Sequence, residues 1–92
     1  MESYILNRKS YIPEVLTLTL YTKPDCPLCD EALDELEAAR QTVPFNLEVV
    51  NIMTDLALYE KYKDDIPVVC LEGEELFRHR VFQAELLQKL SR

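Results

Sequence analysis

The segment around Cys26 and Cys29 constrains this chain most, because it places two thiols where a strand gives way to a helix. Pro27 suits the first helical position, where its missing N–H costs nothing and its fixed φ matches the helix. Cys26 then lies at the helix N-terminus, where unpaired N–H groups and the helix dipole stabilise a thiolate. Cys29 lies on the same helical face within reach of Cys26. The arrangement predicts thiol–disulfide exchange, in which Cys26 attacks and Cys29 resolves the mixed disulfide.

The same two thiols also suit other chemistry, or they have no role. A Cys-x-x-Cys pair can supply half of a structural zinc site, which needs four ligands, or can hold part of an iron–sulfur cluster. The other soft candidates are Cys70 and His79, and neither repeats the paired spacing of a zinc ribbon. We therefore expect redox chemistry without a bound metal or resident cofactor, with a metal or iron–sulfur carrier as an alternative.

Length and composition predict one domain. The 92 residues leave no room for a second domain. Residues 1–14 mix polar and aromatic side chains without a sustained period, and we interpret them as an N-terminal extension of a domain over 15–92. Three cysteines are an odd, low count, unlike a secreted disulfide scaffold, which favours the reducing cytoplasm.

The charge and hydropathy of the chain narrow its partners. The formal net charge of −7 argues against nucleic acid and anionic membrane surfaces. No apolar run approaches the ~18 residues of a membrane span, and the N-terminus lacks the pattern of a signal peptide. We expect a monomer that acts on a disulfide-containing protein or a small thiol.

Hydrophobic periodicity predicts the element order β-α-β-α-β-β-α. Strands are expected over about residues 15–21, 45–50, 68–71 and 75–79, and helices over about 27–41, 55–63 and 82–90. Thr54 is expected to cap the second helix, with Leu56 buried beneath it. Phe82 is expected on the buried face of the last helix, with Leu86 and Leu90. A crossover helix implies a parallel strand pair, and the short turn at Gly73 implies an antiparallel hairpin. The fold class is therefore α/β, with a four-stranded mixed sheet flanked by helices.

Two motifs carry a resemblance to a known family. The run Tyr21-Thr22-Lys23-Pro24-Asp25-Cys26-Pro27-Leu28-Cys29 and the later Ile66-Pro67-Val68 resemble the glutaredoxin family of the thioredoxin fold. The resemblance implies that Cys26 is the nucleophile and Cys29 the resolving thiol. It places Lys23 near the thiolate or a glutathione carboxylate, and makes Ile66 and Pro67 a substrate groove with Pro67 in the cis form.

The chain departs from this family in two places. Leu28 stands where glutaredoxins usually have an aromatic residue between the cysteines. Glutaredoxins also carry a Gly-Gly pair after the hairpin, and a polar residue with an aspartate at the last helix, which hold glutathione. Here the stretch reads Phe77-Arg78-His79-Arg80-Val81-Phe82. We therefore expect weak glutathione binding, with Arg80 as a contact for an anionic partner, although glutathione stays a possible electron donor.

A non-enzymatic function is the competing class. A thioredoxin-fold module can dock an extended peptide by strand-like hydrogen bonds in the groove beside Pro67. Cys70, in the middle of an apolar strand, is interpreted as an inert core thiol, and His79 as a surface or half-buried strand residue.

Overall fold

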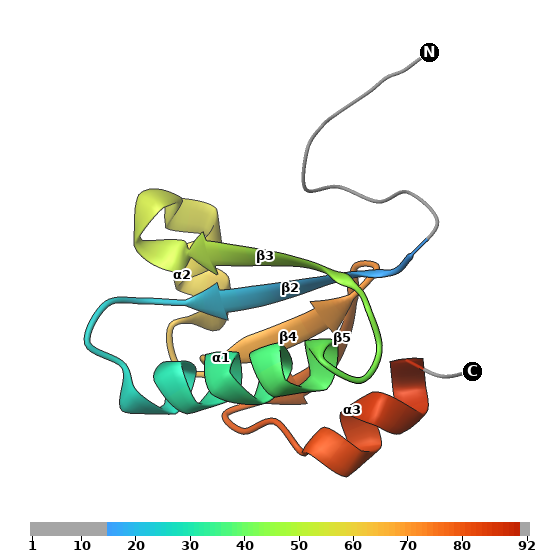
Figure 1. Ribbon diagram of the computed structural model, residues 1–92. Helices are drawn as coiled ribbons and strands as arrows, with labels where there is room; N and C mark the ends of the chain where they lie inside the picture. Colours follow the sequence, from blue (N-terminus) through green and yellow to red (C-terminus); the bar gives the residue numbers. More distant parts are fainter. Residues whose placement is uncertain (1–14, 91–92) are drawn as a thin grey trace.

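The computed structural model describes residues 15–90 (Figure 1). The extension expected at residues 1–14 lies outside this part of the chain. The elements in order are β2 (Thr17–Thr22), α1 (Pro27–Arg40), β3 (Asn46–Asn51), the 3₁₀ turn η1 (Ile52–Thr54), α2 (Leu56–Tyr62), β4 (Val68–Leu71), β5 (Glu74–Arg78) and α3 (Gln83–Leu90). The expected element order is confirmed, and the strand and helix ends fall within about two residues of their predicted positions.

The four strands form one mixed sheet in the order β3-β2-β4-β5. β2 pairs in parallel with β3, and α1 makes the crossover between them. β4 lies antiparallel to both β2 and β5. Glu72 and Gly73 turn the β4–β5 hairpin, both with positive φ (50° and 86°), which is the backbone that a tight two-residue hairpin needs. The predicted mixed sheet and hairpin are thus confirmed.

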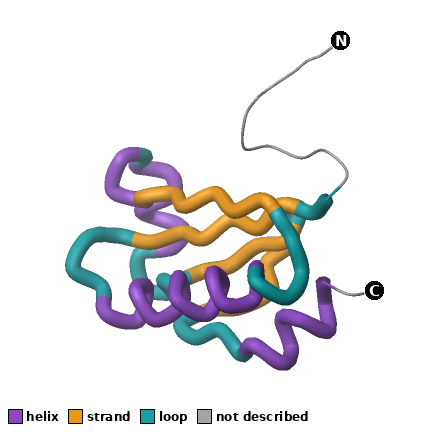
Figure 2. The backbone as a smooth tube through the Cα atoms, viewed as in Figure 1, coloured by secondary structure: helices purple, strands orange, loops and turns teal. Residues whose placement is uncertain are grey.

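Helices cover both faces of the sheet, with α1 and α3 on one face and α2 on the other (Figures 1 and 2). All four residues of β4 are buried, as expected of a central strand covered on both faces. Alternate residues of β4 serve opposite faces, because side chains alternate along a strand. The larger core cluster holds Leu18, Leu20, Ala32, Leu36, Ala39, Phe45, Val69, Leu71, Phe77, Val81, Leu86 and Leu90.

A smaller cluster on the opposite side lies next to the two thiols. Its buried members are Cys29, Ile52, Tyr62, Ile66, Val68 and Cys70. Cys26 and Tyr59 pack against its edge, and Tyr21 stacks on Tyr62 with ring centroids 4.7 Å apart. The start of α1 and the turn before β4 therefore meet at one end of the sheet, where Figure 2 shows both connections.

Three predicted details of the helices are wrong. Asp55, not Thr54, caps α2: its Oδ1 accepts from the N–H groups of Ala57 (2.9 Å) and Leu58 (3.2 Å). Thr54 belongs to the preceding 3₁₀ turn, whereas a capping residue must have extended backbone angles, as Asp55 has.

Leu56 and Phe82 are the other two corrections. Leu56 is 76% exposed, and Tyr62 is the residue that the 7-residue α2 buries. Phe82 is 55% exposed and precedes α3, which begins at Gln83 and buries Leu86 and Leu90. Gln83 Nε2 donates to Glu35 Oε1 (2.7 Å), which joins the start of α3 to α1.

Candidate functional site

The two thiols lie where β2 ends and α1 begins. Cys26 is the N-cap of α1, with extended backbone angles, and Pro27 follows at the first helical position. The Cys26 Sγ accepts a hydrogen bond from the Cys29 N–H (3.2 Å), and the Cys26 carbonyl accepts from the Asp30 N–H (3.1 Å). A sulfur atom therefore stands where a capping oxygen usually does. This position, aimed at free N–H groups and the positive end of the helix dipole, favours negative charge on that sulfur.

Cys26 and Cys29 form a disulfide in this structure, with their Cα atoms 5.2 Å apart. The two sulfurs differ in access, because Cys26 is partly exposed whereas Cys29 is only 3% exposed. A partner from solution can therefore reach Cys26 and not Cys29. This difference supports the roles predicted for the two thiols.

The loop before β4 lies against the two cysteines. The Ile66–Pro67 peptide bond is cis, as the resemblance implied. Pro67 is fully buried, and Ile66 belongs to the same buried cluster as Cys29, with Cys26 at its edge. The structure therefore brings together four of the predicted site residues, namely Cys26, Cys29, Ile66 and Pro67.

Residues after β5 hold the cis-proline loop in place. The His79 N–H donates to the carbonyls of Pro67 (2.8 Å) and Asp65 (3.3 Å). Arg78 Nη1 lies 2.8 Å from Asp65 Oδ2, and Arg78 also binds the carboxylate of Glu75 through Nε and Nη2. The Arg78 guanidinium holds the pKa of Glu75 below its ordinary value. Sequence reasoning missed this clamp, since nothing in the spacing of Asp65 and Arg78 predicts their contact.

The predicted basic patch at residues 78–80 is divided by these contacts. Arg78 is neutralised by two carboxylates, and His79 Nε2 lies 4.0 Å from Asp65 Oδ1. Arg80, in contrast, has no ion pair with any residue from 15 to 90. Among residues 78–80, Arg80 therefore carries the positive charge that no carboxylate of residues 15–90 pairs with.

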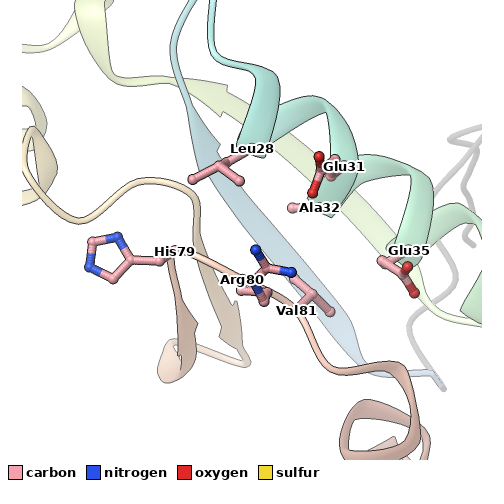
Figure 3. Close-up of a pocket in the computed structure, with 7 residues that line it drawn as sticks. All are labelled: Leu28, Glu31, Ala32, Glu35, His79, Arg80 and Val81. Carbon is pink, nitrogen blue, oxygen red and sulfur yellow. The ribbon is translucent and has the colours of Figure 1, made fainter.

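Arg80 lines a pocket between α1 and the β5–α3 connection, which we call the Arg80 pocket (Figure 3). Its lining residues are Leu28, Glu31, Ala32, Glu35, His79, Arg80 and Val81. The pocket thus carries carboxylates on the α1 side and a guanidinium on the other. Leu28 contributes here because it occupies the second position of α1, directly after Pro27. The sequence pattern singled out Arg80 but not Glu31 or Glu35 as residues of this site.

Lys23 lies away from Arg80, in a second concave site that we call the Lys23 groove. This groove is lined by Lys23, Pro24, Asp25, Met53 and Tyr59. Asp25 directly precedes Cys26 and has a positive φ of 59°. The two cationic residues predicted for substrate binding are therefore in separate sites, one on each side of the thiols along the chain.

Cys70 is a third thiol in the cluster that contains Cys29. It is free and 5% exposed, and burial raises its pKa, as does the nearby Glu75 charge. A buried thiol held neutral in this way is a poor nucleophile. The interpretation of Cys70 as a core residue is consistent with these properties.

Two features that other functions would need are absent from residues 15–90. No three side chains among His, Cys, Asp and Glu are grouped so that they could hold a metal ion in this range. No helix in the same range is long and apolar enough to span a membrane.

Solved structures define the class of protein. Protein Ne2328 from Nitrosomonas europaea has 30% identity and a TM-score of 0.75, with coverage of 85% of this chain and 94% of that one. Protein XcR50 from X. campestris has 35% identity and a TM-score of 0.66, with coverage of 79% and 93%. Thioredoxin-2 of the malaria parasite is 17% identical with a TM-score of 0.64, covering 82% of this chain and 80% of its own, and so shares the fold. The protein has the thioredoxin fold.

Sequence comparison then gives the family. The model of the "Glutaredoxin-like domain (DUF836)" matches residues 17–91, and the chain belongs to this family. Similar to it is the "Glutaredoxin-like protein YDR286C homolog" of Dictyostelium discoideum, with 26% identity over 81 residues, which are 82% of this chain and 75% of that protein. The glutaredoxin resemblance of the two motifs is confirmed at the level of the family.

Proposed function

We propose that the protein is a thiol–disulfide oxidoreductase that uses Cys26 and Cys29. The observation that carries the proposal is the pair itself: a partly exposed sulfur caps a helix, and a buried sulfur lies one turn inside at disulfide distance. The loop before β4 supports the proposal, because Ile66 packs in the same buried cluster as Cys29, with Cys26 at the edge of that cluster.

The proposed reaction exchanges two electrons between the Cys26–Cys29 pair and a substrate disulfide, and it needs no resident cofactor. In the reduced protein the Cys26 thiolate attacks one sulfur of a substrate disulfide, and the other substrate sulfur leaves as a thiolate. The Cys29 thiolate then attacks Cys26, and the second substrate sulfur leaves. The substrate gains two electrons and two protons, and the protein is left with the Cys26–Cys29 disulfide.

We propose a disulfide-containing protein as the oxidised substrate, and a small thiol as the reductant that returns the Cys26–Cys29 disulfide to two thiols and is itself oxidised to a disulfide. Glutathione is the weaker candidate, because the stretch from Phe77 to Phe82 holds bulky and basic residues and lacks the paired glycines through which glutaredoxins contact glutathione. Glu31 and Glu35 on the facing helix add negative charge to that site. An odd count of three cysteines, with Cys70 free, supports the reducing cytoplasm as the compartment.

An equilibrium redox titration tests this function. The protein is incubated in buffers of graded redox potential, quenched by alkylation, and its modified thiols are counted by mass spectrometry. We expect a reversible two-electron transition, about 30 mV per tenfold change in the ratio of forms, in which Cys26 and Cys29 change together. A Cys70→Ser variant is the matched control and should titrate identically.

Other outcomes would favour the alternatives. Zinc or iron recovered with the purified protein in stoichiometric amount, and lost in a Cys26→Ser variant, would indicate a carrier. A pair that titrates but reduces no protein disulfide, while the protein still binds extended peptides, would indicate a binding module.

A further inference from the structure

Two large apolar side chains are exposed in the short segment that contributes Met53 to the Lys23 groove. Met53, at the middle of η1, is 56% exposed, and Leu56, at the first position of α2, is 76% exposed. Met53 lines the groove itself, together with the ring of Tyr59 and the ring of Pro24. Adjacent exposed apolar groups of this size mark interaction sites more often than scattered single ones do.

The groove is continuous with the thiol that faces solvent. Asp25 lines the groove and is bonded to Cys26, while Tyr59 and Cys26 pack against the same buried cluster. A polypeptide joined to Cys26 therefore has its neighbouring residues within reach of Met53 and Tyr59. Phe82, exposed to the same degree at 55%, follows Arg80 and Val81 on the Arg80 side.

Charge within the groove does not favour a partner of one sign. The Lys23 side chain is exposed and forms no ion pair with any residue that the structure describes. The exposed carboxylate of Asp25 lines the same groove and offsets the Lys23 charge. Selection of a partner at this groove therefore depends on its apolar side chains.

We infer that the Lys23 groove binds an apolar side chain next to the reactive cysteine of a disulfide-containing polypeptide. The inference deepens the proposed function and rests on it. Met53 is the specificity-determining residue, because its flexible thioether can adapt to apolar side chains of different shape. Binding of one apolar side chain in such a site changes kcat/KM between two otherwise identical substrates by about tenfold or more.

Paired peptide substrates test the groove. Two peptide disulfides, identical except for Leu or Ser beside the cysteine, are reduced by the wild-type protein, by Met53→Ser and by Phe82→Ser. The readout is the ratio of the two kcat/KM values for each protein. We expect about a tenfold preference for the Leu peptide in the wild type and in Phe82→Ser, and a ratio near one in Met53→Ser.

The opposite results overturn the inference. A wild-type ratio near one, or a preference that survives in Met53→Ser, shows that the groove does not select the partner. A preference lost only in Phe82→Ser places partner recognition at the Arg80 side. Circular dichroism of each variant shows whether a lost preference reflects misfolding.

A separate measurement distinguishes failure of the proposed oxidoreductase function from failure of the groove inference. If the wild-type protein does not reduce even hydroxyethyl disulfide, the oxidoreductase proposal is wrong. Binding of the same two peptides with cysteine replaced by serine, followed by fluorescence anisotropy, then reports on the groove alone. A Leu preference in that assay, lost in Met53→Ser, supports the groove, and equal binding of both peptides contradicts it.

Discussion

At the scale of single residues, Cys26 combines two roles in one atom. Its sulfur accepts the Cys29 N–H and so caps α1, and the same sulfur is the part of the pair that solvent reaches. Reduction frees this sulfur for exchange, and the helix terminus stabilises its thiolate form. The exposed carboxylates of Asp25 and Asp30 flank the pair and oppose that charge.

We predict that the three thiols of the reduced protein react with iodoacetamide in the order Cys26, Cys29, Cys70. Cys26 is accessible, Cys29 is buried one turn inside, and the pKa of Cys70 is raised by burial. Mass spectrometry of timed samples at neutral pH gives the order, and Cys29→Ser should accumulate a mixed disulfide on Cys26. Faster labelling of Cys29 than of Cys26 would reverse the assigned roles.

At the scale of elements, the cis-proline loop is fixed by the end of β5. His79 binds it through the backbone and Arg78 through a side-chain ion pair with Asp65. These contacts cross between segments that the chain separates by more than ten residues. These contacts therefore stabilise the packing of the end of β5 against the loop before β4, whereas an ion pair within one helix stabilises only that helix.

We predict that Arg78→Ala lowers the urea midpoint of the oxidised protein more than Arg40→Ala does. Arg40 is the matched control, since it too is exposed and pairs with an acid three residues away, Glu37, but within α1. Such exposed pairs within a helix contribute only about 0.3–0.5 kcal/mol.

The pH dependence of stability checks the same clamp. Because Arg78 lowers the pKa of Glu75 in the folded state, the ion pair stabilises above the ordinary Glu pKa of about 4.3. That stability is lost as the pH falls through the lower folded value. Urea unfolding between pH 3 and 7 should show a shallower loss in Arg78→Ala than in the wild type. Equal midpoints for the two arginine variants, or superposed pH profiles, would contradict the clamp.

The sequence predicted the positions of the helices and strands better than it predicted which of their side chains are buried. The strands and α1 follow from long apolar repeats, and the cysteine motif fixes where α1 begins. Leu56 and Phe82 were misplaced because α2 and the start of α3 are too short for periodicity to identify a buried side. Asp55 and Thr54 are both residue types that cap helix N-termini. Thr54 lies in the 3₁₀ turn before α2, so Asp55 is the residue that caps this helix. The Arg78 clamp and the Lys23 groove depend on contacts across the fold, which no local pattern contains.

At the scale of the whole molecule, the charge of the chain works against anionic substrates. The net charge of −7 repels an anion from most directions, and Glu31 and Glu35 face the Arg80 pocket. Arg80 is the unpaired cation at that pocket, and Lys23 is the one at the groove. The acidic surface should slow the reaction with an anionic disulfide, and the Arg80 guanidinium should partly offset this effect. Comparing the reduction rates of an anionic and a neutral disulfide measures the contribution of Arg80.

We predict that Arg80→Ala slows the reduction of an anionic disulfide such as oxidised glutathione by roughly a few-fold more than that of neutral hydroxyethyl disulfide at low salt. The difference should shrink as salt is raised from 10 to 500 mM, because screening removes the contribution of an exposed charge. Stopped-flow rates with both substrates measure it. Arg40→Ala makes the same charge change at the far end of α1 and should leave the ratio of the two rates nearly unchanged. Equal slowing of both substrates at every salt concentration would mean that Arg80 does not contact the anion.

The backbone at His79 suits a smaller residue. His79 has a φ of 70°, a conformation that glycine adopts without cost and that histidine tolerates less well. A His79→Gly replacement would therefore need no rebuilding of the loop that the His79 N–H anchors. It would remove the imidazole from the lining of the Arg80 pocket. The connection between β5 and α3 can thus change the shape of this pocket through one side chain while its backbone stays in place.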